Sequence, residues 1–383
     1  MAVAPWVLLP LVLPSPRSWL WRVSRSALAF ALVGGVNAAA TGAVLILPTL
    51  WFLTRRWNRR TALAGATWLG LVTAVSLWWL LPLIQLGRYS PPFLSWIEDA
   101  GVTTGTASVF ESFRGTSTWL GFLAGSAGPV WPAGWQFVTT PVLIVGTVLV
   151  ATAGLVGLAL RSTPHRRFLA IAAAVGLILL TFGHSGAAGS PLAGVLQDLL
   201  DGPLAPLRNT HKLELVLRLP LMLAAAQTLT VGGARIRALR APHFLAPVVA
   251  TSLVILVAAP AIVGGMARPD GYVAIPAHWY AAAAWLDHQS APGTVLVVPA
   301  AAFADFTWGS TKDEPLQALM GGPSRSGTRC RWDRPAPPGC WTRSSASWVR
   351  AWVALSCVRC SSALACDTSS SGTTSGSTRR ATR

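Results

Sequence analysis

The apolar residues of the chain gather into runs that are long enough to cross a lipid bilayer as helices. A spanning helix needs about 20 mostly apolar residues. Five runs meet or approach this length: residues 61–84, 141–160, 168–182, 217–231 and 244–266. A sixth run, residues 27–53, is interrupted by GGVN at positions 34–37, and it fits either one long helix or two half-helices. The pattern predicts an α-helical polytopic membrane protein.

Short arginine clusters separate these runs and predict how the helices are oriented. Three clusters lie at residues 55–60, 161–167 and 235–240. Two predicted spans separate each cluster from the next, so all three fall on one face, which the positive-inside rule assigns to the cytoplasm. Residues 86–140, residues 183–216 and everything after residue 266 then lie outside. A further cluster reaches the inner face only if residues 27–53 turn back within the membrane: Arg17, Arg22 and Arg25. We therefore predict a multi-pass plasma-membrane protein whose long polar loops are extracytoplasmic.

The pattern changes after residue 266. AHWYAAAAWLDHQ predicts a helix, Gly293 a turn and TVLVVPA a buried strand, which together indicate the start of a small extracytoplasmic α/β unit over residues 267–320. From residue 321 the chain is rich in arginine and holds all five cysteines, but CVRC is a lone CxxC that matches no zinc pattern. We interpret residues 321–383 as out-of-frame translation or a disordered tail, and residues 1–266 as the transmembrane domain.

Composition agrees with a membrane protein and excludes two other classes. Apolar residues make up 52% of the chain and charged residues 11%. The net charge of +17 invites a nucleic-acid partner, but the arginines form no continuous basic face and no nucleic-acid module is recognisable, so we predict no nucleic-acid binding. The absence of a P-loop, of a GxGxxG following a strand and of HExxH argues against an enzyme that uses soluble nucleotides.

The first long loop holds the first acidic residues of the chain. Its candidate groups are Glu98, Asp99, Glu111, Arg88 and Arg114. Glu98 and Asp99 are adjacent, so on a helix they would point roughly 100° apart and would not form a catalytic pair, although either could bind a sugar hydroxyl or a divalent metal. Glu111 and Arg114 stand three residues apart, and a surface ion pair on a helix is the simpler reading of them. Arg88, in RYSPPF, lies at the membrane boundary, where it could meet a phosphate or extend to lipid headgroups.

The second long loop holds a cationic group. Residues 190–202 predict a short amphipathic helix, with Ser190 as its N-cap and Gly202 at its end. Arg208, His211 and Lys212 follow just before the next span, at the depth of a lipid phosphate. Binding of an anionic lipid carrier and simple headgroup anchoring both explain these cations. We interpret His184 as a structural interfacial histidine.

Five stretches of the chain resemble a known family. They are GGVNAAAT (34–41), LGRYSPPFLSWIE (86–98), ESFRGTSTW (111–119), PLAPLRNTHKLELVLRLP (203–220) and WGSTKDEPLQ (308–317). In this order they resemble the actinobacterial alpha-(1→3)-arabinofuranosyltransferases over roughly residues 3–320. The resemblance implies a GT-C membrane glycosyltransferase that transfers arabinofuranose from decaprenyl-phosphate-arabinose to cell-wall arabinan, in arabinogalactan and lipoarabinomannan, on the outer face of the membrane.

The chain departs from the family pattern at both ends. GT-C enzymes carry a catalytic acid in the first outer loop, after the first helix, and this chain starts several helices later, so we expect that acid to have no counterpart here. The family also extends far beyond the C-terminus, where carbohydrate-binding modules are expected. We therefore expect an N-terminally truncated GT-C domain that is inactive as it stands.

The resemblance implies an inverting displacement in which a carboxylate takes the acceptor proton and cations stabilise the leaving lipid phosphate. The donor-phosphate candidates are Arg88, Arg208, His211 and Lys212; the sugar-contact candidates are Arg114 and Tyr89; the weak catalytic candidates are Glu98, Asp99 and Glu111. The expected partners are the polyprenyl-phosphate sugar donor, the arabinan acceptor and membrane lipid, and a divalent metal stays open as a cofactor. The alternatives are a lipid-linked sugar transporter or flippase, which would need charged spans and repeated halves, and a non-catalytic envelope scaffold.

Overall fold

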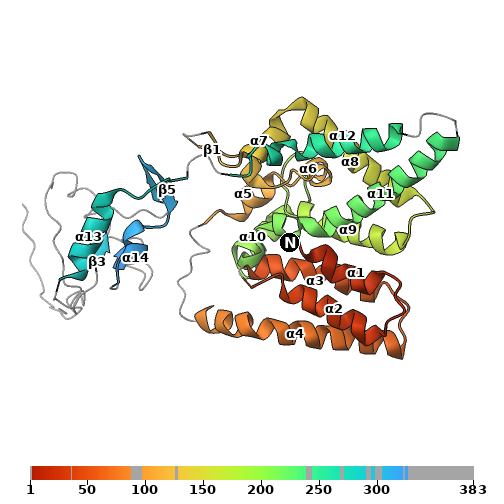
Figure 1. Ribbon diagram of the computed structural model, residues 1–383, viewed down its shortest axis with the longest axis horizontal. Helices are drawn as coiled ribbons and strands as arrows, with labels where there is room; N and C mark the ends of the chain where they lie inside the picture. The colour runs from red at the N-terminus through yellow and green to blue at the C-terminus, as the bar shows by residue number, and fades with distance from the viewer. Residues whose placement is uncertain are drawn as a thin grey trace, which may run out of the picture. The chain divides into compact units, whose positions relative to one another are not determined.

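The structure is a computed structural model that describes most of the chain up to residue 326. The described residues are 2–35, 37–87, 97–125, 128–238, 244–267, 271–289, 295–297, 304–321 and 324–326. The chain divides into two compact units, Met1–Pro269 and Asp270–Arg383 (Figure 1). Arg88, Tyr89 and the cysteines of the predicted tail lie outside the described residues.

The first unit is built almost entirely from helices. In chain order its elements are α1 (Ala4–Val12), α2 (Trp19–Ala31), α3 (Ala38–Leu53), α4 (Arg59–Gly87), α5 (Ala100–Gly105), α6 (Val109–Arg114), the 3₁₀ helix η2 (Trp119–Phe122), the short antiparallel strands β1 (Ala124–Gly125) and β2 (Gly128–Pro129), α7 (Pro132–Thr139), α8 (Pro141–Ala159), α9 (Arg166–Thr181), α10 (Ala193–Asp201), the 3₁₀ helices η3 (Ala205–Leu207) and η4 (Thr210–Leu213), α11 (Glu214–Ala238) and α12 (Leu245–Ile262).

Three helical segments in the described part of the chain are long and apolar enough to cross a membrane. They are Arg59–Gly87, Pro141–Ala159 and Thr210–Arg235, and Ala38–Leu53 and Pro247–Ile262 are shorter apolar helices. Three of the predicted runs fall within these long segments. The run at 168–182 lies in α9, which has 16 residues and begins with two arginines, and the run at 244–266 contains α12. The prediction of a helical membrane protein is therefore confirmed.

The interrupted run at residues 27–53 forms parts of two helices, which decides between the two alternatives. Asn37 caps α3, because its side-chain Oδ1 accepts a hydrogen bond of 3.0 Å from the amide of Ala40. The hydroxyl of Thr41 donates to the carbonyl of Gly34 at 2.9 Å and fixes the break between α2 and α3.

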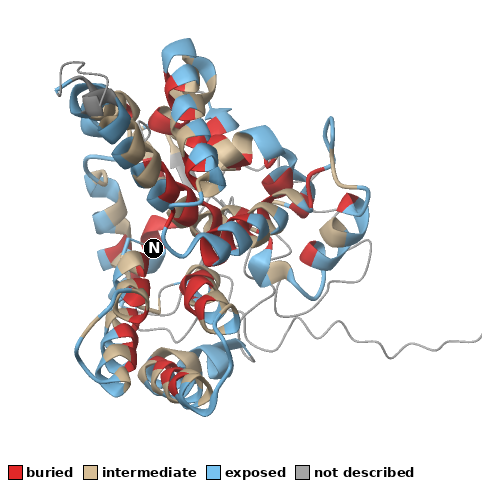
Figure 2. Ribbon diagram, turned by 90° about the vertical axis from the view of Figure 1, so that its right-hand side faces the viewer, coloured by how far each residue is buried: buried red, intermediate tan, exposed pale blue. Residues whose placement is uncertain are grey.

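Helix α11 is the centre of the bundle and packs closely on α8 and α9. A Cβ at Gly157 of α8 would lie 1.9 Å from the carbonyl oxygen of Ala224 in α11, so only glycine permits this approach. Small residues at such contacts are characteristic of helix packing in membranes. Leu217 and Leu221 of α11 are fully buried there. Figure 2 shows buried positions on the sides of the helices that face their neighbours and exposed positions on the outer sides.

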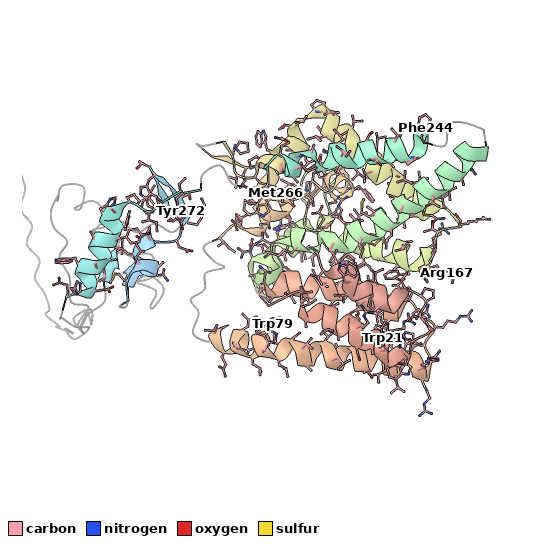
Figure 3. All side chains as sticks on the ribbon, viewed as in Figure 1. Trp21, Trp79, Arg167, Phe244, Met266 and Tyr272 are labelled. Carbon is pink, nitrogen blue, oxygen red and sulfur yellow. The ribbon has the colours of Figure 1, made fainter. Side chains whose placement is uncertain are left out.

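The helices place two kinds of connection at opposite ends of the bundle. Trp21, Arg167 and Phe244 lie at one end, and Trp79 and Met266 lie at the other (Figure 3). The predicted arginine clusters at residues 55–60 and 161–167 therefore lie at the first end, and Arg240 of the third cluster lies outside the described residues. The acidic and cationic segments, residues 97–140 and 183–213, lie towards the second end (Figure 1).

The second unit is a small α/β structure, as the sequence predicts. It contains α13 (Ala277–Asp287), β3 (Val295–Val297), β4 (Ala304–Phe306), β5 (Gly309–Lys312), α14 (Pro315–Leu319) and β6 (Ser324–Ser326). Strand β3 is parallel to β6, and β4 is antiparallel to β5. Its helices meet through Ala283, Leu286 and Leu316. Strand β6 lies within the region that we interpret as a tail, and residues after 326 lie outside the described part.

Candidate functional site

Two segments that are far apart in the sequence form the polar end of the bundle. The carboxylate of Asp99 caps α5 by accepting a hydrogen bond of 2.8 Å from the amide of Val102. The amide of Ala100 donates to Asp201 Oδ1 of α10 at 2.9 Å, and the hydroxyl of Thr103 donates to the carbonyl of Arg208 at 2.9 Å. The first predicted loop is therefore bonded directly to the second.

Arg208 joins the same two segments through its buried side chain. Its Nη1 donates to the carbonyl oxygen of Glu98 at 2.7 Å, its Nε donates to the carbonyl of Leu200 at 3.2 Å, and its Nε lies 3.0 Å from Asp201 Oδ1 in an ion pair. A buried guanidinium needs such partners, because an unpaired buried charge is costly. The structure thus gives Arg208 a positioning role, and its predicted contact with a donor phosphate stays a prediction.

Glu111 and Arg114 form the ion pair expected from their spacing. Arg114 Nη1 lies 2.9 Å from Glu111 Oε1, and the hydroxyl of Thr116 donates to Glu111 Oε2. The prediction of a surface pair is wrong, because the Arg114 side chain is only 3% exposed and the Glu111 side chain 19%. Arg114 also donates from Nε to the hydroxyl of Thr147 on α8 at 3.0 Å and from Nη2 to the carbonyl of Phe137 on α7 at 2.6 Å. The pair therefore fastens α6 to two neighbouring helices.

Arg218 has a similar role, which we did not predict from the sequence. Its Nη1 donates to the carbonyl of Phe113 at 2.6 Å, its Nη2 donates to the carbonyl of Ser112, and its Nε pairs with Glu214 Oε1 at 3.2 Å. Helix α6 ends at Gly115, which has a φ of +80°, and a Cβ there would lie 2.6 Å from the Arg218 guanidinium carbon. The sequence does contain a signal for this role: an arginine lies inside an otherwise uncharged predicted span, with a glutamate four residues before it.

Helix η4 carries the remaining cationic candidates. Lys212 and His211 are half-buried. The ring of Trp119 donates from Nε1 to Asn209 Oδ1 at 3.1 Å and fixes the start of η4. His211 Nδ1 and Thr210 Oγ1 are buried without a hydrogen-bond partner among the described residues. Helix η4 therefore follows directly after Arg208, whose guanidinium binds the backbone of Glu98.

His184 is buried, and its Nδ1 lies 3.4 Å from the carbonyl oxygen of Thr104. This placement suits the structural role we expected. In the described part of the chain, no three His, Cys, Asp or Glu side chains converge as the ligands of a metal ion would. The structure offers no support there for the divalent metal that the sequence leaves open.

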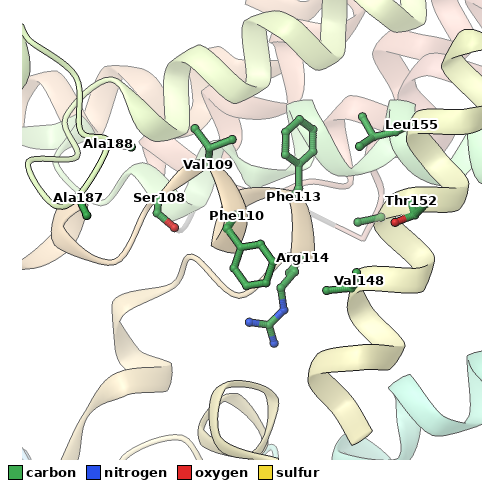
Figure 4. A pocket seen from close by; sticks show the side chains of 11 residues that line it. Ser108, Val109, Phe110, Phe113, Arg114, Val148, Thr152, Leu155, Ala187 and Ala188 are labelled. Atoms are coloured by element: carbon green, nitrogen blue, oxygen red, sulfur yellow. The ribbon is translucent and has the colours of Figure 1, made fainter. Parts of the chain in front are cut away.

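A pocket of about 480 Å³ opens beside the Glu111–Arg114 pair (Figure 4). It lies between α6, α8 and the loop at residues 187–188. Its apolar walls include Phe110, Phe113, Val148 and Leu155, and its polar groups include the Arg114 side chain and the hydroxyls of Ser108 and Thr152. Such a pocket suits an apolar chain.

Comparison with known proteins identifies the family. The profile of the family "Alpha-(1->3)-arabinofuranosyltransferase, N-terminal GT-C domain" matches residues 1–329. The alpha-(1->3)-arabinofuranosyltransferases of Mycolicibacterium smegmatis and Mycobacterium tuberculosis are 43% and 41% identical over 338 and 343 residues, which are 84% of this chain and 24% of each relative. The cryo-EM structure of arabinofuranosyltransferase AftD from mycobacteria aligns with a TM-score of 0.61 and 33% identity over 85% of this chain and 21% of that chain. The chain thus spans about a quarter of the length of the curated relatives it matches. It belongs to the alpha-(1->3)-arabinofuranosyltransferase family and corresponds to the N-terminal GT-C domain.

Proposed function

We propose that this chain is part of a membrane glycosyltransferase that moves arabinofuranose from decaprenyl-phosphate-arabinose to cell-wall arabinan, in arabinogalactan or lipoarabinomannan. The observation that carries the proposal is the polar end of the bundle. Arg208 binds the backbone of Glu98 there, His211 and Lys212 follow it in η4, and a pocket with mostly apolar walls contains the Arg114 side chain. An enzyme that takes its sugar from a lipid carrier needs such a meeting of apolar and ionic groups at the membrane surface.

The orientation that we propose rests on the arginines. The clusters near residues 55–60 and 161–167 are at the end of the bundle opposite α5, α7 and α10 (Figures 1 and 3). Arginine-rich short loops favour the cytoplasmic side. The chain then crosses the plasma membrane several times with its polar end extracytoplasmic, which is where a lipid-linked sugar donor is used.

In this proposal, the isoprenoid segment and the phosphate of the donor are bound at two different places. The pocket beside Arg114 takes the isoprenoid segment next to the phosphate, because most of its walls are apolar. Lys212 and His211 face the phosphate, and Arg88 and Tyr89 complete the donor and sugar contacts from outside the described residues. The three arginines Arg208, Arg114 and Arg218 hold the loops in place through backbone carbonyls.

The chemistry is an inverting displacement at the anomeric carbon. The acceptor hydroxyl oxygen bonds to that carbon, the bond from the carbon to the lipid phosphate oxygen breaks, and a carboxylate takes the hydroxyl proton. Cations near the phosphate stabilise the charge that develops on it. Of the three carboxylate candidates, Asp99 caps α5 and Glu111 is paired with Arg114, whereas the structure shows no hydrogen bond or ion pair of the Glu98 carboxylate among the described residues. Glu98 is therefore the best-placed of the three for proton transfer.

The rival function of sugar-lipid transport has less support. A transport path needs ionisable groups that line the spans. Two charges at the start of α11, Glu214 and Arg218, pair with each other and hold the end of α6. A non-catalytic scaffold needs no such pocket.

The test is sugar transfer by membranes that contain a full-length relative carrying these residues. With radiolabelled donor, Lys212→Met is expected to raise the KM for donor about tenfold, because one charge-assisted phosphate contact is lost. Arg161→Gln, at the opposite end, serves as the control and is expected to leave the KM unchanged. Donor flipping in proteoliposomes without transfer to acceptor, or equal kinetics for both variants, would refute the assignment.

A further inference from the structure

Cationic side chains from four separate segments lie at the end of the bundle away from the candidate site: Arg22 in α2, Arg55 after α3, Arg60 in α4 and His165 before α9. The Arg55 guanidinium carbon and the centroid of the His165 ring each lie 4.9 Å from the centroid of the Trp51 ring. We propose that Arg22, Arg55 and Arg60, beside Trp51, bind the phosphate headgroup of an anionic phospholipid. This site is separate from the donor site and does not depend on the transferase activity.

These cations are close enough to repel one another. Burial lowers the pKa of Arg22, and the positive charges of Arg55 and Arg60 lower it further. Burial also lowers the pKa of His165, and the charge of Arg55 adds to this effect. Like charges that converge in a folded protein carry an energetic cost, which a bound anion offsets.

The protein supplies no anion for this group among the residues that the structure describes. Glu98 is the first acidic residue of the chain, so α1, α2, α3 and α4 contain none. The ion pairs that the structure shows in the described ranges involve Arg114, Arg208 and Arg218, all elsewhere in the bundle. Arg60 and Arg166 also lie in the first turns of α4 and α9, where the helix dipole opposes a positive charge, so helix stability does not explain them.

The geometry of the group goes beyond what membrane orientation requires. The positive-inside rule depends on the number of arginines in short loops and not on their convergence. Here the Arg22 side chain is anchored at the end of α1, because its Nε donates to the carbonyl of Pro10 at 2.8 Å and its Nη2 donates to the carbonyl of Leu11. The Arg55 guanidinium lies over the Trp51 ring, 4.9 Å from its centroid. Guanidinium groups held in this way are prepared to bind phosphate oxygens.

The surroundings favour a lipid over a soluble anion or an acidic protein. Leu53 and Trp57, on either side of Arg55, are 56% and 64% exposed. Trp21 is flanked by Arg25 and Arg17, whose guanidinium carbons lie 4.8 Å and 5.8 Å from the ring centroid. Exposed apolar side chains and tryptophans next to arginines are the composition of the membrane interface, where acyl chains and headgroups meet.

The test measures lipid binding to the purified chain in detergent by native mass spectrometry. Phosphatidylglycerol and phosphatidylcholine with the same acyl chains are compared. The double substitution Arg55→Gln with Arg60→Gln is expected to weaken phosphatidylglycerol binding about tenfold and to leave phosphatidylcholine binding unchanged. The matched control is Arg161→Gln with Arg235→Gln, which removes two charges from the same end but outside the group. Arg55→Lys with Arg60→Lys keeps both charges and is expected to retain most of the binding.

Thermal unfolding gives a second readout. Without anionic lipid, the double glutamine variant is expected to unfold no earlier than the wild type, because repulsion is removed. With phosphatidylglycerol, the wild type is expected to gain more in its unfolding temperature than the variant. Equal binding of both lipids, equal loss in the control variant, saturation by inorganic phosphate alone, or displacement of the lipid by soluble polyglutamate would each overturn the proposal.

Discussion

Arg208 Nη1 donates a hydrogen bond of 2.7 Å to the backbone carbonyl of Glu98, across 110 positions of sequence. Through this contact, a cation of the second polar loop holds the first polar loop in place. It also holds the backbone of Glu98 in place, whereas the Glu98 carboxylate makes no hydrogen bond or ion pair among the described residues. The sequence alone treats these candidate residues as equivalent ligands. The structure divides them into residues that hold the backbone in place and residues whose side chains are available to a ligand.

Substitution of Arg208 tests this support. Arg208→Ala leaves Asp201 without its cation and the carbonyls of Glu98 and Leu200 without a donor. We expect a loss of about 2 kcal/mol in unfolding free energy, below the figure for a fully buried pair because the Asp201 side chain is 41% exposed. Denaturant unfolding in detergent measures the loss. Asp201→Asn is expected to cost less, since its amide can still accept hydrogen bonds from Ala100 and Arg208, and an equal cost for both variants would contradict this account.

Gly115 and Arg218 form a second testable pair. Gly115→Ala places a methyl group at a φ of +80° and against the Arg218 guanidinium. The backbone conformation alone costs about 1–2 kcal/mol. Because the steric overlap depends on the arginine, the same substitution in an Arg218→Ala background is expected to cost less, with a coupling energy of about 1 kcal/mol between the two positions. A double-mutant cycle of unfolding free energies measures it, and strict additivity would show that the two residues do not interact.

The class of the fold could be predicted from the sequence, but the separate roles of the residues in the candidate site could not. The long apolar runs and the positions of the arginines are visible in the sequence, so the helices and the two ends of the bundle could be predicted. The contacts of Arg114 and Arg208 with backbone carbonyls did not follow, because a cation that meets a sugar or a phosphate and a cation that binds backbone carbonyls look alike until the carbonyls of Phe137 and Glu98 are located. The break between α2 and α3 stayed open for the same reason, since the cap at Asn37 depends on three-dimensional geometry.

Close packing of α8 on α11 predicts a large cost for one methyl group. Gly157→Ala would bring Cβ to 1.9 Å from the carbonyl oxygen of Ala224, so the helices must separate. We expect a loss of about 1–3 kcal/mol, the usual cost of overpacking. Gly70→Ala on α4 is the matched control, because no heavy atom lies within 4 Å of the added methyl group. The control is expected to gain about 0.5–1 kcal/mol from helix propensity. Thermal unfolding of both variants in the same detergent distinguishes them.

The pocket beside Arg114 predicts a dependence on the length of the donor lipid. Thr152→Phe adds an aromatic ring to the pocket wall on α8, whereas Val156→Phe adds one to an exposed position of the same helix outside the pocket. In a full-length relative, the first variant is expected to raise the KM for a long-chain donor about tenfold and to affect a short-chain analogue less, since about 1.4 kcal/mol of apolar contact is lost. The control variant should change neither KM. A Thr152→Phe variant that treats both donors alike would remove the pocket from the donor site.

In the second unit, Glu314 predicts a dependence of stability on pH. Burial raises the pKa of its carboxyl group above the ordinary value of 4.5, and a hydrogen bond from the backbone of Leu316 only partly opposes this effect. Its Oε1 is buried without a hydrogen-bond partner among the described residues. Because the folded-state pKa is the higher one, the folded state binds the proton more tightly. The stabilisation is then complete below pH 4.5 and is lost as the pH rises through the folded-state value.

Glu314→Gln keeps the shape of the side chain and removes its charge, so this variant isolates the effect of the buried charge on stability. The variant is expected to be more stable than the wild type at neutral pH and to lose this advantage as the pH falls towards 4.5. Hydrogen exchange of the amides in α13 and α14, followed as a function of pH, reports the stability of the second unit alone. Asp313→Asn, one residue earlier and exposed, is the control for a general change in net charge. If both variants shift protection equally at every pH, the burial of Glu314 has no special effect and the change in charge alone accounts for the result.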